Sequence, residues 1–219
     1  MTTDKPNILL LSLAYRSYLD ETYTTLLNHL LAVSTVKRAK TAPAALRVLQ
    51  NTTFKAILIT DEGLTQPSPA NREVLAKIKA YIKAGGLAII GLHFPNFTNR
   101  DQFDHFFKGM GVPWQRGDYT RTTFQFVPEA TVPASLRLEA LPGPYSMKAL
   151  HVRGARCQEK MFVPVEGAVT QSLVFGAEGV DEMQAGVVGA RIGMGDLVYC
   201  GDVNGEEGSD AVMLALCGF

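Results

Sequence analysis

The sequence has no excess charge of either sign, and this absence limits the partners it can have. Its 219 residues include 21 Lys plus Arg and 21 Asp plus Glu, which gives a formal net charge of zero and a pI near 6.9. Without net positive charge the chain has no long-range field to attract a polyanion. We therefore expect no nucleic acid among its partners.

Cysteine is scarce, and long apolar runs are missing. The three cysteines, Cys157, Cys200 and Cys217, are an odd number without Cys-x-x-Cys spacing, which favours neither a disulfide framework nor a zinc site. The apolar run 8–13 is short for a signal sequence, and no run approaches the roughly 20 residues that cross a bilayer. These absences predict a cytoplasmic protein that has no membrane partner.

Motifs of common cofactor and hydrolase sites are absent as well. The glycines of residues 189–195 lack G-x-G-x-x-G spacing and precede a predicted strand, so they do not indicate a dinucleotide site. The serine-hydrolase motif G-x-S-x-G does not occur. No pair of carboxylates has a recognisable metal-ligand spacing to a histidine. We expect neither a cofactor nor a metal.

The chain does have enough apolar material for a core, with 47% hydrophobic and 19% charged residues. In its first half two hydrophobic periods alternate. Continuous apolar runs predict buried strands, and apolar stripes at helical spacing predict helices between them. The predicted strands are Asn7–Leu13, Thr35–Ala39, Phe54–Thr60 and Leu87–Leu92. Helices are predicted around Leu19–Leu31 and after the capping residues Thr41, Ser68 and Asn99.

The second half is broken by proline and glycine into short pieces, which favours strands over long helices. We predict a single α/β domain over residues 1–219, with a doubly wound, mostly parallel, flavodoxin-like sheet. A β-rich elaboration over about residues 112–190 would add antiparallel strands. The strands predicted there are Tyr119–Val127, Met147–Val152, Ser172–Phe175, Ala185–Ile192 and Asp196–Cys200, followed by a helix over Ser209–Leu216.

Polar side chains follow each predicted parallel strand. Because open α/β sheets bind ligands beyond the carboxyl ends of their strands, these residues predict a pocket for a small polar molecule. The alternative is that loops are polar in any case and acidic residues favour helix starts. The candidates are Tyr15 and Arg16 after the first strand, Asp61 and Glu62 after the third, His93 and Asn96 after the fourth, and Asp202, Asn204 and Glu206 after the last.

One segment carries a family resemblance. GGLAIIGLHFPN, residues 85–96, places a helix stop, an apolar strand and Gly-x-His in succession, and it resembles the nucleophile-elbow segment of the class I glutamine amidotransferase-like fold. Within that superfamily it looks most like the trehalose-utilisation, or ThuA-like, group. The opening KPNILLL, the Asp61–Glu62 pair and the closing GMGDLVYCGDVNGEEG are similar as well. The resemblance implies the same fold, and a carbohydrate as one candidate ligand.

The same comparison exposes a departure from the glutaminases of that superfamily. Those enzymes have a cysteine at the elbow and a later His-x-Glu pair, whereas this chain has His93 at the elbow and no histidine in residues 201–204. We therefore do not expect glutamine hydrolysis. Cys200, at the end of the last strand, is a conceivable substitute nucleophile, but a strand-end cysteine is more often a small buried hydrophobe.

Two hypotheses remain for the site. In the first, the chain is an enzyme with hydrolase or isomerase-type acid/base chemistry, in which His93 is the general base and Asp61 or Glu62 orients it. Tyr15, Arg16, Asn96, Asp202, Asn204 and Glu206 would then hold the substrate. In the second, the chain is a catalytically inactive binding or assembly module that keeps the elbow because the fold needs the turn.

Two further groups in the second half call for an interpretation. The aromatic residues Trp114, Tyr119, Phe124 and Phe126 form either part of the core or a homodimer surface. His151, with Arg153 and Arg156 close behind, forms a basic cluster that we expect on the solvated surface.

Overall fold

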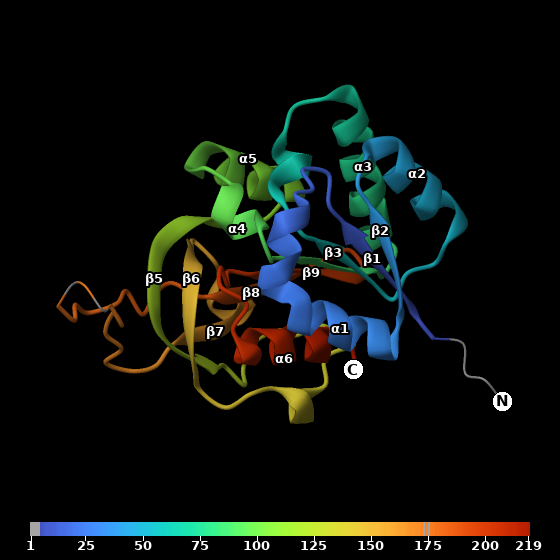
Figure 1. Ribbon diagram of the computed structural model, residues 1–219. Helices are drawn as coiled ribbons and strands as arrows, with labels where there is room; N and C mark the ends of the chain where they lie inside the picture. Colours follow the sequence, from blue (N-terminus) through green and yellow to red (C-terminus); the bar gives the residue numbers. More distant parts are fainter. Residues whose placement is uncertain (1–4, 173, 175) are drawn as a thin grey trace.

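The computed structural model describes residues 5–172, 174 and 176–219, and these residues form one sheet of nine strands (Figure 1). The strand order is β2-β1-β3-β4-β9-β8-β7-β5-β6. The first five strands in this order are parallel, and the others pair antiparallel. This arrangement confirms the predicted fold class. The parallel strands are β1 (Asn7–Leu11), β2 (Thr35–Ala39), β3 (Ala56–Ile59), β4 (Leu87–Ile90) and β9 (Gly195–Cys200), and the antiparallel ones are β5 (Gln115–Phe126), β6 (Tyr145–Arg153), β7 (Lys160–Pro164) and β8 (Val187–Ile192).

Helices cover both faces of the parallel strands (Figure 1). Side chains of α2, α3 and α5 pack on one face, and those of α1 and α6 pack on the other. Both faces of these strands are therefore buried, as their continuous apolar sequences require. The helices are α1 (Thr24–Val33), α2 (Ala42–Asn51), α3 (Pro69–Lys83), α4 (Phe94–Phe97), α5 (Arg100–Met110) and α6 (Glu207–Leu216), with 3₁₀ helices η1 (Ser17–Tyr23), η2 (Glu62–Thr65), η3 (Leu138–Ala140) and η4 (Cys157–Glu159).

The helix starts follow the local capping signals. Ser68 Oγ accepts the Asn71 N–H at 3.0 Å, and Thr41 Oγ1 accepts the Ala44 N–H at 3.4 Å. Asn99 forms a reciprocal capping box with Gln102. These three predictions are confirmed. The stripe expected as one helix near the start is instead divided between η1 and α1.

Two predictions for the second half differ from the structure. Strand β7, whose sequence KMFVP ends in proline, was not predicted because proline marks a strand end or edge more often than a strand. The predicted strand Ser172–Phe175 is not seen at Ser172 or Val174, and residues 173 and 175 lie outside the described residues.

Strand β6 is the last strand in the sheet order, but its outer backbone groups also form hydrogen bonds. The Leu150 N–H donates to Gly201 O at 2.9 Å, and the Val152 N–H donates to Ala185 O at 2.8 Å. The antiparallel strands therefore curl until β6 meets the segment that follows β9. These hydrogen bonds use backbone groups of β6 that could otherwise pair with a strand of another chain. They also bring β5 and β6 beside the carboxyl ends of the parallel strands. Within the described part of the chain, no helix is long and apolar enough to cross a bilayer.

Candidate functional site

The turn after β4 has the strained geometry of an elbow, but the strain falls on Leu92. Leu92 has φ 55°, the only positive φ of a non-glycine residue in the described ranges. Its side chain is buried, and its carbonyl accepts the Tyr23 hydroxyl at 2.8 Å. A leucine side chain has no nucleophilic atom, so this elbow cannot form the thioester of a glutaminase.

His93 lies in this turn and is the N-cap of the short helix α4. Its side chain is 9% exposed, and its ring lies edge-on to Tyr23 at 4.8 Å and to Phe97 at 6.2 Å between centroids. The cavity beside it measures about 10 Å³, near the lower limit for one water molecule. Four predicted site residues meet at this cavity, namely Tyr15, Arg16, Asp61 and His93.

Asp61 and Glu62 are engaged by the loops that present them. Asp61 Oδ1 accepts the N–H groups of Gly63 at 3.0 Å and Ala14 at 3.1 Å, which ties the loop after β1 to that after β3. Burial raises the pKa of Asp61 despite these two hydrogen bonds. Glu62 forms a two-pronged ion pair with Arg16, one prong being Nη1 to Oε2 at 3.1 Å. Both carboxylates therefore have structural partners.

The remaining candidates gather after β9. Asp202 is 3% exposed and accepts three backbone N–H groups, from Asn204 at 2.9 Å, Gly205 at 3.2 Å and Glu206 at 3.0 Å. It thus holds the loop that leads into α6. Asn96 links this group to the first one, because its Nδ2 donates to Val203 O at 3.1 Å.

Glu206 connects this loop to the antiparallel strands. Its Oε1 accepts Arg121 Nη2 at 2.5 Å and the Lys148 N–H at 3.4 Å. With its amide oriented to suit both neighbours, Asn204 accepts from Arg121 Nη2 at 2.8 Å. Sequence reasoning therefore found the acceptors of this cluster but missed the cation that they hold.

Asp202 and Glu206 shift each other's pKa in opposite directions. Burial, then the hydrogen bond and repulsion from Glu206, raise the pKa of Asp202 to about 8. Burial also acts to raise the pKa of Glu206, but the hydrogen bonds from Asp202 and Arg121 outweigh it and the net shift is downward. The two shifts favour the proton on Asp202 and the negative charge on Glu206.

Cys200 is not a nucleophile in this arrangement. It is 2% exposed at the end of β9, and burial raises the pKa of its thiol to about 12. The thiolate needed for attack is therefore almost absent at neutral pH.

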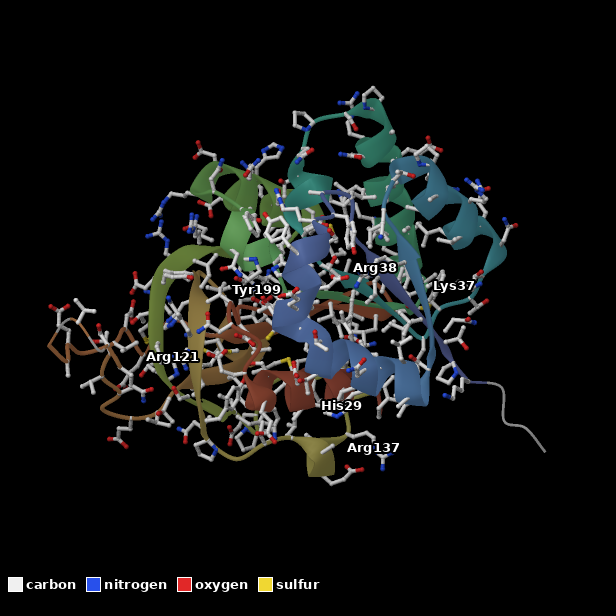
Figure 2. The ribbon with its side chains drawn as sticks, viewed as in Figure 1. His29, Lys37, Arg38, Arg121, Arg137 and Tyr199 are labelled. Carbon is white, nitrogen blue, oxygen red and sulfur yellow. The ribbon has the colours of Figure 1, made fainter. Side chains whose placement is uncertain are left out.

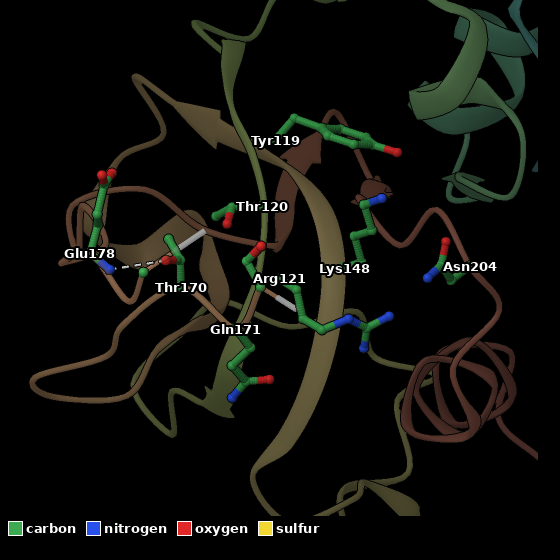
Figure 3. Close-up of a pocket in the computed structure, with 10 residues that line it drawn as sticks. Tyr119, Thr120, Arg121, Lys148, Thr170, Gln171, Glu178 and Asn204 are labelled. Carbon is green, nitrogen blue, oxygen red and sulfur yellow. Dashed lines mark hydrogen bonds between the residues drawn. The ribbon is translucent and has the colours of Figure 1, made fainter. Parts of the chain in front are cut away.

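A cavity of about 680 Å³ lies beside this cluster (Figure 3). Arg121 on β5 points toward Asn204, and Lys148 on β6 points toward the Tyr119 ring (Figure 3). Arg121 lies well away from Arg38, which lines the small cavity at the parallel edge (Figure 2). The large cavity is lined by Tyr119, Thr120, Arg121, Lys148, Thr170, Gln171, Ser172, Gly176, Glu178 and Asn204. Of these only Asn204 was predicted; the polar alternation of Tyr119, Arg121 and Thr123 along β5 was an available signal.

His151 is not on the surface, contrary to the interpretation of the basic cluster. It is fully buried against the Phe124 ring, with 5.1 Å between centroids, and burial lowers its pKa. Neither ring nitrogen has a hydrogen bond of good geometry among the described residues. Arg156, in contrast, is exposed at its end and pairs with Glu159 at 3.3 Å.

Most of the aromatic segment belongs to the core. Trp114 and Phe124 are buried, whereas Tyr119 is 47% exposed at the large cavity. The homodimer stays a prediction. In the described ranges, no group of three His, Cys, Asp or Glu side chains is placed to hold a metal ion.

Comparisons with known proteins agree with this architecture. No protein-family model and no curated protein sequence matches the chain. A solved ThuA-like protein from Bacteroides uniformis is similar with a TM-score of 0.60 and 9% identity, over 99% of this chain and 91% of that one. A cytoplasmic protein from Salmonella typhimurium is similar with a TM-score of 0.57 and 12% identity, over 96% of this chain and 98% of that one.

A third similar structure is much larger. A β-galactosidase from Halorubrum lacusprofundi has a TM-score of 0.53 and 15% identity, and the match covers 97% of this chain but 30% of that one. The chain therefore has the class I glutamine amidotransferase-like fold. Its fold is similar to that of the solved ThuA-like proteins, and in this chain antiparallel strands extend the parallel half. At these identities the likeness establishes the fold and leaves the activity open.

Proposed function

We propose that this protein binds a small polar molecule at the carboxyl edge of its sheet. The cavity lies between β5, β6, the loop after β9 and the described residues Thr170–Ser172, Gly176 and Glu178. The observation that carries the proposal is the difference in space: about 680 Å³ here against about 10 Å³ beside His93. The larger volume lies in the range of small-molecule sites. The proposed site is thus at the carboxyl edge of the sheet, where open α/β sheets bind ligands, but it lies nearer to the antiparallel strands than to β4.

The lining of this cavity suits a hydroxyl-rich molecule. It combines hydroxyl and amide groups, among them Thr120, Thr170, Gln171 and Asn204, with the exposed ring of Tyr119. Such groups exchange hydrogen bonds with hydroxyls, while an aromatic face covers the apolar face of a sugar ring. A carbohydrate therefore fits, and one similar structure belongs to a β-galactosidase.

Acid–base catalysis at His93 is the second candidate. It is favoured by the position of His93, Asp61 and Arg16 at one small cavity. This function requires that cavity to open, because nothing larger than a water molecule fits there now. We place either function in the cytoplasm.

Two exposed tyrosines, one near each of the two cavities, allow a matched test. Tyr119 is 47% exposed at the large cavity, and Tyr18 is 67% exposed in η1, just after the loop that borders His93. Glucose, galactose and trehalose are titrated calorimetrically into the wild type and the two Tyr→Ala variants. We expect Tyr119→Ala to weaken binding by about fivefold, in line with the loss of one aromatic contact, and Tyr18→Ala to change nothing.

The same titration with His93→Ala separates the two candidates. Affinity equal to the wild type supports the large cavity. If His93→Ala abolishes binding while Tyr119→Ala leaves it unchanged, the large cavity is not the site and the His93 candidate takes its place.

A further inference from the structure

Two cations stand directly opposite each other on the wall of the large cavity. Arg121 of β5 and Lys148 of β6 are register partners in an antiparallel pair, so their side chains share one face of the sheet. Like charges in directly opposed positions destabilise a strand pair. Figure 3 shows the Arg121 side chain extending toward Asn204 and the Lys148 side chain extending toward the Tyr119 ring.

The protein neutralises one of these charges and leaves the other. Glu206 pairs with Arg121. Lys148 has no ion pair in the described part of the chain; its ammonium lies 5.1 Å from the centre of the Tyr119 ring. Two cations and one carboxylate leave one positive charge at this wall. Asp202 is engaged by its own loop, where it accepts the backbone N–H groups of Asn204, Gly205 and Glu206.

Glu178 also lines the cavity but does not cancel this charge. It lies beside Thr170, across β5 from the two cations (Figure 3). The cationic wall and the acidic residue therefore border different parts of the cavity.

We propose that the ligand is a carboxylate-bearing polyol of sugar-acid type, with its carboxylate beside Lys148 Nζ and Arg121. This proposal rests on the binding function proposed above and adds the charge of the ligand. A single negative charge matches the single unbalanced cation, whereas a phosphate dianion would exceed it. The hydroxyls would meet Asn204 and Gln171, and the ring or chain would lie on Tyr119.

Glu206 acts as a positioning residue for this site. Its ion pair and the Arg121 Nη1 contact with Ser146 Oγ at 3.3 Å hold the guanidinium at the cavity wall. Gln171 is held in the same network, because its Oε1 accepts Ser146 Oγ at 2.5 Å and its Nε2 donates to Thr123 Oγ1 at 2.9 Å. Such prior ordering lowers the entropy cost of binding.

The test compares glucuronate with glucose, which share a ring and differ in the carboxylate. Both are titrated at low salt into the wild type, Lys148→Gln and the control Lys77→Gln, which removes the same charge from an exposed position on α3. We expect glucuronate to bind about tenfold more tightly than glucose to the wild type. Lys148→Gln should remove that advantage and leave glucose affinity unchanged, and Lys77→Gln should match the wild type.

Each other outcome contradicts a specific part of the argument. Equal affinities for glucuronate and glucose, both lost in Tyr119→Ala, would overturn the charge assignment and leave the binding function standing. Tighter binding of glucose 6-phosphate than of glucuronate would overturn the choice of a carboxylate. No binding of any of these probes at 10 mM would overturn both proposals.

Unfolding of Lys148→Gln provides the control for the fold. Because the substitution removes a like-charge contact, its urea midpoint should equal or exceed that of the wild type. A lower midpoint together with weaker glucuronate binding would assign Lys148 to structure, and the proposal would then fail.

Discussion

The carboxyl edge of the sheet has two regions that look alike in sequence and differ in structure. After β1, β3 and β4, the predicted polar residues bind one another: Asp61 ties two loops together, Glu62 holds Arg16, and almost no space is left. After β9 the acceptors also serve their loop, but Arg121 and Lys148 enter from β5 and β6, and a large cavity remains. A polar residue after a strand is therefore weak evidence for a ligand site. It indicates such a site only if its side chain still has a donor or acceptor that the loop backbone does not use.

The largest effect should come from the buried carboxylates that organise each region. Asp61→Ala and Asp202→Ala each remove the acceptor of two or three backbone N–H groups. We expect each to lower the free energy of unfolding by about 2 kcal/mol, measured by urea denaturation. Only Asp202→Ala should also weaken glucuronate binding.

Glu129→Ala, at an exposed position, provides the baseline and should stay within about 0.5 kcal/mol of the wild type. Equal loss of glucuronate affinity in Asp61→Ala and Asp202→Ala would erase the distinction between the two regions.

A smaller effect should appear in the pH dependence of stability. The pKa of Asp202 is raised in the folded state to about 8, so between pH 4 and 8 the folded chain holds a proton that the unfolded chain releases. This contribution is complete below the unfolded pKa and is lost as the pH rises through the folded value. Glu206, whose pKa is lowered, contributes the opposite slope below its ordinary range. The unfolding free energy of the wild type should therefore fall from pH 5 to 8 more steeply than that of Asp202→Asn.

Urea titrations of both chains at pH 5, 6, 7 and 8 measure this difference. His151 does not mimic it, because its lowered pKa makes stability fall toward acid and not toward base. Parallel profiles would show that Asp202 is ionised at neutral pH, which would place a second negative charge beside Arg121.

The smallest effect concerns Glu178. Its carboxylate borders the cavity on the side of β5 opposite the two cations. Glu178→Gln should therefore raise glucuronate affinity by no more than about twofold and leave the urea midpoint unchanged. A tenfold gain would mean that Glu178 faces the bound carboxylate.

The parallel half could be predicted because its signals are local. Apolar runs, the caps Thr41, Ser68 and Asn99, and the helix stop at Gly85, where φ is 110°, are all read within a few residues. The antiparallel half could not be predicted to the same degree. Its contacts join residues far apart in sequence, and a one-residue change of register reverses which side chains face the cavity.

The residues of the candidate site likewise fall into a group that the sequence predicts and a group that it does not. The residues after β9 were found because strand ends converge in any open sheet. Arg121 and Lys148 were missed because their pairing depends on the β5–β6 register, which no local pattern specifies. The distinction between His93 and Leu92 was missed for a different reason: the sequence shows where the turn falls but not which of its residues takes the positive φ.

The closure of β6 onto the segment after β9 has a mechanical consequence. The Val203 N–H donates to Lys148 O at 3.1 Å and the Lys148 N–H donates to Glu206, so the backbone that carries the ammonium is tied on both sides to the opposite wall. The two walls cannot hinge apart without breaking these ties. Entry and exit of an occupant should therefore proceed through a fixed opening, and amide exchange at Lys148 and Val203 should be slow with or without one.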